Sequence, residues 1–108
     1  ILFQTNGDPA EFMYYDQRLE EYYPEDIVSK ARGALDVLSA TKRGLPFEEV
    51  VNLMRHRPNL SALAPESALK VLHTLRDDFY LVNAGDLWRF KLPIVRDWWY
   101  QSRGRLPL

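Results

Sequence analysis

The sequence contains no cysteine. Disulfides, thiolate metal sites and cysteine nucleophiles are therefore excluded together, and the absence agrees with a reducing compartment, so we expect a cytoplasmic protein. Long hydrophobic runs are missing as well, because no apolar stretch approaches the ~20 residues that a membrane-spanning helix needs. At 108 residues the chain is expected to hold one hydrophobic core, and nothing in it predicts contact with a membrane.

Motifs for catalysis and nucleotide binding are also missing. The sequence has neither a G-x-x-x-x-G-K-[ST] phosphate loop nor a G-x-G-x-x-G turn. His56 and His73 stand alone, outside an H-E-x-x-H motif or a paired-carboxylate arrangement at metal-ligand spacing. The adjacent acidic pairs at 48–49 and 77–78 diverge by about 100° on a helix, so neither can form a proton-sharing dyad. We therefore expect no enzymatic activity, cofactor or metal in this chain.

Charge is unevenly distributed along the chain, although the net charge is −1. Residues 1–27 contain seven acidic residues and one arginine, a net −6, whereas residues 28–108 contain thirteen cations and eight acids, a net +5. Such a split indicates either a basic body that binds a polyanion or two segments that face each other. An ordinary solvated surface of mixed charge is the third interpretation.

The stretch 79–92 predicts a β-hairpin. Phe79–Val82 is rich in aromatic and β-branched residues, which suit a half-buried strand. Asn83–Asp86 supplies the turn, in which Gly85 is free to adopt φ > 0. From residue 87 onward, apolar residues alternate with cations at the strand period of two, which predicts the apolar set inside and the cations outside. The apolar set is Trp88, Phe90 and Leu92, and the cations are Arg89 and Lys91.

Five helices are predicted from apolar residues at helical spacing and from proline or acidic residues at the helix starts. Their ranges are 9–22, 26–43, 46–57, 65–78 and 93–103. Asp8 is expected to cap the first helix and Gly44 the second. The stripe of the fourth helix that is expected to face the core consists of Ala68, Leu69, Leu72 and Leu75.

Three consecutive helices followed by a two-stranded wing have the order of a winged helix-turn-helix. The helices are those at 26–43, 46–57 and 65–78, and the wing is the hairpin at 79–92. We therefore predict a mainly α fold with a small β-hairpin, in which a winged helix-turn-helix carries an extra N-terminal helix and a C-terminal helix.

Duplex DNA is one candidate partner, because the second helix of a helix-turn-helix enters the major groove. The residues predicted to contact DNA are Ser67, Lys70 and Thr74 on helix 65–78, together with Arg89 and Lys91 on the wing. Glu66 and Asp77 place negative charge on the same helix, whereas a DNA reader normally carries a basic stripe. The wing cations also have a simpler interpretation, since charges on an edge hairpin prevent aggregation.

A protein is the other candidate partner, and tryptophan and arginine dominate the hot spots of protein interfaces. The residues predicted to contact it are Arg96, Trp98, Trp99 and Arg103. Trp98 and Trp99 are adjacent, so they cannot both face one core. Either one of them is buried while the other lies near the surface, or both lie under the acidic N-terminal helix. Self-association through the tyrosine-rich helix 9–22 is a third interpretation.

One stretch resembles a known family: Trp88-Arg89-Phe90-Lys91-Leu92-Pro93-Ile94-Val95-Arg96-Asp97-Trp98-Trp99. An aromatic-Arg-Phe strand, then a proline, then a helix with arginine and tryptophan is similar to the closing motif of winged-helix domains that follow the P-loop core of prokaryotic AAA+ and STAND-type ATPases. Asp8-Pro9 and the aromatic helix behind them also resemble the end of the preceding ATPase lid. The nucleotide-binding motifs of that family are absent here, so no ATPase residue is carried over.

The resemblance implies a C-terminal module of a larger nucleotide-driven protein, in which the winged helix either binds DNA or packs on the ATPase core. A chain that begins at Ile1 rather than Met agrees with a fragment of a longer polypeptide. We expect residues 1–25 to be an acidic lead-in from a lid and residues 26–108 to be the winged-helix domain. The predicted function is an interaction or regulatory module that contacts its own ATPase core or another protein. The alternative is DNA binding through helix 65–78 and the wing.

Overall fold

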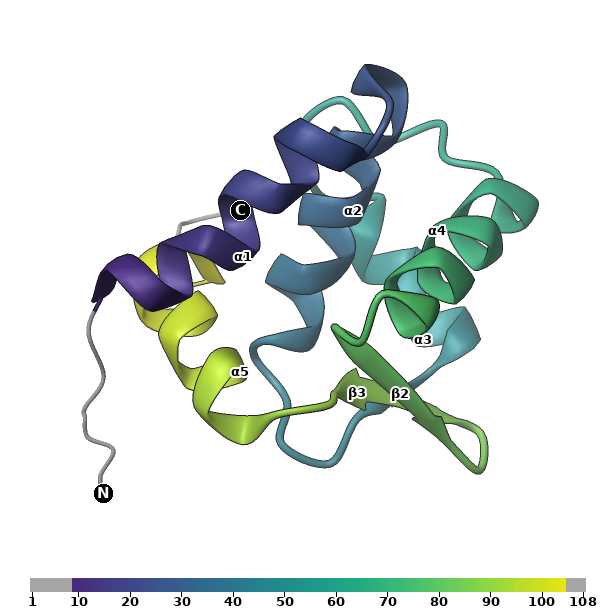
Figure 1. Cartoon of the computed structure of the whole chain (residues 1–108). Helices are drawn as coiled ribbons and strands as arrows, with labels where there is room; N and C mark the ends of the chain where they lie inside the picture. Colours follow the sequence, from purple (N-terminus) through teal and green to yellow (C-terminus); the bar gives the residue numbers. More distant parts are fainter. Residues whose placement is uncertain (1–8, 105–108) are drawn as a thin grey trace.

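The computed structural model describes residues 9–104, and the side chains of residues 12–103. Its elements are α1 (Pro9–Tyr22), α2 (Glu25–Leu38), β1 (Leu45–Pro46), α3 (Phe47–Met54), α4 (Pro65–Asp77), β2 (Leu81–Ala84), β3 (Leu87–Phe90), α5 (Pro93–Trp99) and the π-helical turn η2 (Tyr100–Gly104) (Figure 1). The predicted cap at Asp8 lies outside the described residues. No helix within 9–104 is both long enough and apolar enough to cross a membrane.

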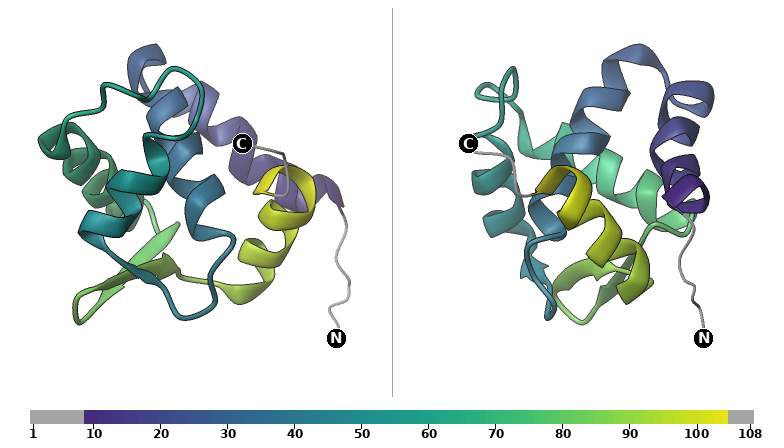
Figure 2. Two further views of the ribbon diagram at one scale, coloured as in Figure 1. Left: turned by 180° about the vertical axis from the view of Figure 1, so that it is seen from behind. Right: turned by 90° about the vertical axis from the view of Figure 1, so that its left-hand side faces the viewer.

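The predicted fold class is confirmed, because the chain is mainly helical with a small antiparallel sheet. Helices α2, α3 and α4 precede the hairpin β2–β3 in the order predicted from the sequence, with α1 before them and α5 after them. α2 lies at the centre and contacts each of the other helices, and α1 and α5 lie side by side (Figure 2). Leu19 of α1 belongs to the same hydrophobic core as α2. The domain division at residue 25 stays a prediction.

The sheet contains a third strand that was not predicted. β1 pairs antiparallel with β3, with Leu45 opposite Trp88 and Pro46 opposite Leu87, so the strand order is β1-β3-β2. β1 is two residues long and one of them is a proline, which cannot donate to a ladder, so it carries no strand pattern. Because β1 and β2 pair with opposite edges of β3, the strand β3, which carries Arg89, is the central strand.

Two helices end earlier than predicted, α2 at Leu38 and α3 at Met54. After α2 the chain turns to enter β1, and the backbone N–H of Gly44 donates to Oγ1 of Thr41 at 3.1 Å. Gly44 has φ +101°, and a Cβ built on it would lie 2.7 Å from the backbone oxygen of Trp88. Gly44 therefore makes the close turn before β1, and the prediction that it caps α2 was wrong.

The hairpin is shorter than the predicted range 79–92. β2 begins at Leu81, and the turn consists of Gly85 and Asp86 alone, with φ +63° at Gly85. Asn83 and Ala84, which were predicted to form part of the turn, are the end of β2. The two strands pair in register, so the turn needs no further residues.

The inward and outward sides of β3 are largely as predicted. Trp88 and Phe90 face the core and are 4% and 3% exposed, while Arg89 is half-buried and Lys91 is exposed. Leu92 was predicted to lie with the aromatics, and this was wrong, because it is 44% exposed. The strand ends at Phe90, and Leu92 is already the cap of α5, so the period of two no longer applies to it.

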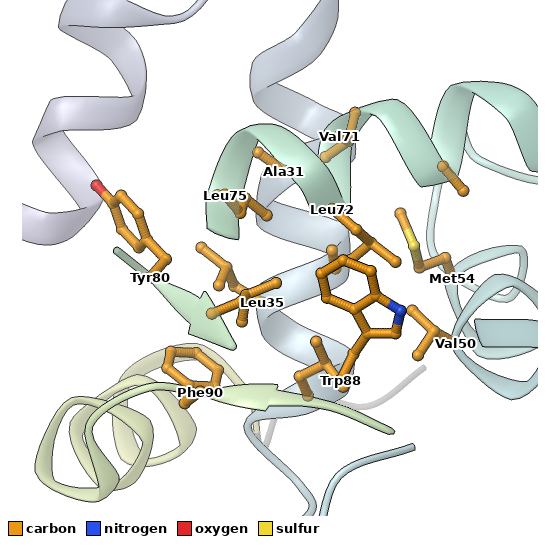
Figure 3. Packing of buried hydrophobic residues seen from close by; sticks show 14 of the residues in the cluster. Ala31, Leu35, Val50, Met54, Val71, Leu72, Leu75, Tyr80, Trp88 and Phe90 are labelled. Carbon is orange, nitrogen blue, oxygen red and sulfur yellow. The ribbon is translucent and has the colours of Figure 1, made fainter. Parts of the chain in front are cut away.

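One hydrophobic core joins the helices to the sheet (Figure 3). The Trp88 ring lies on the core side of β3, near Val50, Met54 and Leu72. The buried residues of α4 have the spacing i, i+3, i+4, i+7, and they are Ala68, Val71, Leu72 and Leu75. Leu69 was predicted for this stripe and is instead exposed, because it lies about 100° around the helix from Ala68.

Gly44→Ala tests the turn that leads into β1. Alanine would have to adopt φ +101° with its Cβ 2.7 Å from the Trp88 oxygen, so we expect the free energy of unfolding to fall by roughly 2–3 kcal/mol. Gly85→Ala is the matched control, because φ is +63° there and nothing lies within 4 Å, so its loss should be about 1 kcal/mol. Urea unfolding measures both, and equal losses would contradict the close approach at Gly44.

Candidate functional site

A buried carboxylate on α2 gathers donors from two distant segments. The Asp36 side chain is 2% exposed and accepts a hydrogen bond from Nη2 of Arg57 at 2.7 Å. Nε1 of Trp99 donates to its other oxygen at 2.7 Å, and Nε of Arg103 lies 3.1 Å from that same oxygen. Burying a charge is costly unless charged and hydrogen-bonded partners surround it, and here both oxygens are bound. Asp36 thereby ties the connector after α3 and the C-terminal helix to α2.

The two adjacent tryptophans differ in burial. Trp99 is fully buried, so its side chain offers no surface to a partner. Trp98 is half-buried, and its ring stacks on Phe12 of α1 with 6.0 Å between centroids. Of the two alternatives for this pair, the arrangement matches the first, because Trp99 is buried against Phe90 of the hairpin and Trp98, beside α1, lies nearer the surface.

The two arginines predicted for protein contact also bind residues of this chain. Arg96 donates to the backbone oxygen of Ser39 at 3.2 Å and pairs with Asp97. Arg103 pairs with Asp36 as described. These contacts hold α5 and η2 in place, and contact of Arg96, Trp98 or Arg103 with a partner stays a prediction.

The exposed side of α4 carries mixed charge. Lys70 and Thr74 are exposed and Ser67 is half-buried, and the Thr74 hydroxyl donates to the backbone oxygen of Lys70 at 2.9 Å. Glu66 and Asp77 are exposed on the same helix. Helical spacing places these residues along the solvent-facing side of α4. Negatively charged side chains there lie next to a lysine and a threonine, so this side is not a continuous basic surface. The predicted contacts of α4 with DNA remain untested by this geometry.

The wing residues lie beside other elements rather than in one basic stripe. His73 of α4 lies beside β3, with the centroid of its ring 5.7 Å from that of Trp88. Arg89 lies next to the turn before β1, where a Cβ on Gly44 would be 3.2 Å from its own Cβ. Nζ of Lys91 lies 4.6 Å from the centroid of the Phe79 ring, on the opposite edge of the sheet from β1. Arg89 and Lys91 therefore lie in different surroundings and do not belong to one basic stripe.

A surface that was not predicted gathers exposed apolar side chains from three segments around two cations. We call it the aromatic face, and its apolar members are 44–68% exposed. It consists of Tyr14, Arg18 and Tyr22 on α1, Phe79 between α4 and β2, and Lys91, Leu92 and Ile94 at the start of α5. The tyrosine-rich helix 9–22 was already a candidate interaction surface from its sequence. Phe79 was predicted as a strand residue and Leu92 as a core residue, so their part in this face was missed.

Arg18 joins the parts of the aromatic face. Its guanidinium carbon lies 5.9 Å from the ring centroid of Tyr14 and 5.5 Å from that of Tyr22. Its Nη2 donates to Asp78, the neighbour of Phe79, at 2.8 Å. The face is therefore continuous from α1 to the end of α4.

A groove of about 480 Å³ opens between α1 and α5 within this face. Tyr14 and Arg18 line it on one side, and Leu92 and Ile94 line it on the other. Val95 and Phe12 close its floor toward the core, where both are at least partly buried. The lining is mostly apolar with one guanidinium, which suits a large apolar side chain of a partner.

A buried phenol, Tyr80, and a half-buried one, Tyr23, hold α1 against the junction of α4 and β2. The Tyr80 hydroxyl points to α1 and donates to the backbone oxygen of Tyr15 at 2.6 Å (Figure 3). The Tyr23 hydroxyl donates to Oδ2 of Asp78 at 3.1 Å. Burial raises the pKa of both phenols, and the carboxylate of Asp78 raises that of Tyr23 further. Both hydroxyls therefore stay protonated and act as hydrogen-bond donors. Their hydrogen bonds fix the position of α1, which carries Tyr14 and Tyr22 of the aromatic face, relative to the end of α4.

Phe79 occupies a backbone conformation that normally belongs to glycine. α4 ends in a Schellman motif, in which the Tyr80 N–H donates to the Leu75 oxygen at 2.9 Å and the Phe79 N–H to the Arg76 oxygen at 3.1 Å. Phe79 has φ +68°, the left-handed region, which costs a residue with a side chain on the order of 1–2 kcal/mol. A bulky residue with positive φ is an outlier that calls for a functional explanation.

A wider groove of about 710 Å³ lies over Asp36 between α1, α2 and the connector after α3. Its arginines are already matched by carboxylates. Arg32 is bound by Asp16 at 2.8 Å and by Glu20 at 3.4 Å, and Arg57 and Arg103 are bound by Asp36. This groove is therefore a poor anion site. Among the side chains described, no three His, Cys, Asp or Glu residues lie together as metal ligands would.

Comparison with known proteins found no matching family model, no matching curated protein and no matching solved structure. The resemblance of residues 88–99 to ATPase-associated winged helices therefore stays a prediction. The surfaces of this chain are what point to its function.

Asp36→Asn removes the buried charge while keeping the shape of the side chain. We expect the free energy of unfolding to fall by roughly 3 kcal/mol. Arg57 and Arg103 lose their counter-charge, and the NH2 group of the asparagine faces hydrogen-bond donors where the carboxylate had an acceptor oxygen. Asp97→Asn is the matched control, since that carboxylate is 63% exposed in its pair with Arg96, and its loss should be at most about 0.5 kcal/mol. Urea unfolding followed by tryptophan fluorescence compares the two. Similar small losses for both would contradict a central role for Asp36.

Phe79→Gly and Phe79→Ala separate the backbone strain at Phe79 from its ring. Glycine relieves the left-handed conformation, so we expect the free energy of unfolding to stay the same or rise by up to about 1 kcal/mol. Alanine keeps the strain and loses the contact of the ring with Lys91, so we expect a fall of about 0.5 kcal/mol. Thermal and urea unfolding measure both variants. A glycine variant that is less stable than the alanine variant would contradict the observed φ.

Proposed function

We propose that this chain is a winged-helix interaction module that contacts a protein, either the ATPase-like core of its own parent polypeptide or a separate partner. The observation that carries the proposal is the aromatic face. Five large apolar side chains from three segments are 44–68% exposed there, and they surround two cations. Contiguous exposed apolar surface marks interaction sites, and tyrosine with arginine is the composition of interface hot spots.

The exposed side of α4 supports a protein partner over specific reading of DNA. Its cation Arg76 already pairs with the adjacent Asp77 at 3.2 Å. Glu66 adds a second carboxylate to the same helix. Carboxylates beside the reading positions repel phosphates, and no further arginine of α4 remains to bind guanine bidentately.

DNA binding is the second candidate, because some cations near the sheet have no carboxylate partner among the described residues. Lys42 and Arg43 are exposed just before Gly44, and Gly44 lies next to Arg89. Lys91 at the end of the wing and Lys70 on α4 are exposed as well. These groups would bind phosphates rather than base edges.

The link to an ATPase rests on the resemblance of residues 88–99. The flanking sequence of the parent gene tests it directly, because a glycine-rich phosphate loop upstream would support an ATPase and its absence would remove that part of the proposal. The proposal of a protein-binding module does not depend on that outcome.

A mobility-shift titration with duplex DNA distinguishes the two candidates. We expect no retarded complex at micromolar protein, even at about 50 mM salt, because the unpaired cations of the described residues are few and scattered. Lys70→Ala and Arg89→Ala probe the predicted contacts, and Lys30→Ala on α2 is the charge-matched control. A complex that disappears at about 200 mM salt and is weakened by the first two variants alone would overturn the protein-binding proposal in favour of DNA.

A further inference from the structure

We propose that the segment bound by the aromatic face is an acidic amphipathic helix. Its apolar side chains would pack on Tyr14, Tyr22 and Phe79, and a flanking carboxylate would pair with Lys91. This inference rests on the proposed function and adds the chemical class of the partner to it.

The position of Phe79 is the first observation in favour of a docked partner. The Schellman motif at the end of α4 needs only backbone groups, and glycine would form it without strain. Phe79 nevertheless places an aromatic ring there, and that ring is 68% exposed with Lys91 against it. The ring contributes little to the core, so its position is explained by contact with something outside this chain.

The charge of the face indicates an acidic partner. Arg18 and Lys91 are the cations of the aromatic face, and the nearby carboxylate of Asp78 is already bound by Arg18 at 2.8 Å and by the Tyr23 hydroxyl at 3.1 Å. Lys91 has no carboxylate partner among the described residues. Glu21 on α1 is seven residues after Tyr14, so by helical position it lies beside this face as well. Because Arg18 is paired with Asp78, Lys91 is the cation of this face that is left to bind a partner, and it attracts a carboxylate rather than a basic group.

The shape of the face fits a helix. Tyr14 and Tyr22 are eight residues apart on α1, a distance of about 12 Å along the helix axis. About two turns of a partner helix span that length, so anchors at i, i+4 and i+7 could reach along the face. The groove of about 480 Å³ between α1 and α5 holds one large anchor, between Tyr14 and Ile94.

A display selection tests the proposal even though the partner is unidentified. The probe is a library of random peptides of about 18 residues, long enough to form a short helix, selected against the whole chain. The selected peptides are then synthesised, and their affinities are measured by fluorescence anisotropy for the wild type and for two variants of the face. Phe79→Gly removes the ring and keeps the backbone geometry, and Lys91→Gln removes the cation beside it.

Two variants away from the face serve as matched controls. Met13→Ala shortens an exposed apolar side chain on the other side of α1, and Lys70→Gln neutralises an exposed cation on α4. We expect selected peptides with apolar residues at i, i+4 and i+7 and with Asp or Glu beside them. Their dissociation constants should rise about tenfold with Phe79→Gly and about threefold with Lys91→Gln, while the controls change nothing.

The outcomes separate failure of this inference from failure of the proposed function. Peptides that depend on Phe79 but are neutral or basic would overturn the acidic partner and leave a protein-binding face. Peptides that are unaffected by Phe79→Gly, or no peptides at all, would overturn the face as a docking site. Phe79-dependent self-association in sedimentation, or Phe79-dependent binding to vesicles of phosphatidylcholine with about one-third phosphatidylserine, would overturn it in favour of a second copy or a lipid surface.

Discussion

The buried carboxylate of Asp36 is the interaction on which the arrangement of this chain depends. It is buried on α2 beneath the groove of about 710 Å³, and a buried charge is tolerated only with partners. Arg57 comes from the connector between α3 and α4, and Trp99 and Arg103 come from the C-terminal end. One group therefore fixes both the connector after α3 and the position of α5 relative to α2. The C-terminal helix packs into the core through Val95 and Trp99, while Leu92 at its cap and Ile94 in its first turn are exposed.

Ion pairs also hold the acidic N-terminal helix α1 in place against the rest of the chain. Along one side of α1, Asp16 and Glu20 bind Arg32 of α2, while on the other side Arg18 binds Asp78 at the end of α4. These contacts agree with the interpretation that the acidic and basic segments face each other. They also fix α1 beside the junction of α4 and β2. That placement joins Tyr14 and Tyr22 through Arg18 to Asp78, the neighbour of Phe79, and so creates the aromatic face.

The helices and the inward side of β3 could be predicted because each depends on local periodicity and on prolines at the helix starts. The features that were missed depend on contacts distant in sequence. β1 exists only because it pairs with β3, and Phe79 lies where a helix pattern meets a strand pattern, so neither period describes it. The burial of Asp36 was missed for the same reason. By helical spacing Asp36 lies nearly opposite the apolar stripe of α2, so the pattern places it on the polar side, and its burial depends on Arg57, Trp99 and Arg103, which are distant in sequence.

The distribution of paired arginines bears on the choice of partner. Most arginines of the basic body, including Arg32, Arg57 and Arg103, are already bound to carboxylates within the chain. Arginine is the side chain best suited to bidentate recognition of bases and phosphates, so the net +5 of this segment overstates what is available to a polyanion. Among the described residues of this segment, the cations without a carboxylate partner are Lys30, Lys42, Lys70, Lys91, Arg43, Arg55 and Arg89, and Arg55 is bound to the backbone oxygen of Leu63. Arg18 is paired too, yet its guanidinium also lies against two exposed tyrosine rings, and such a combination serves a protein interface better than a nucleic acid.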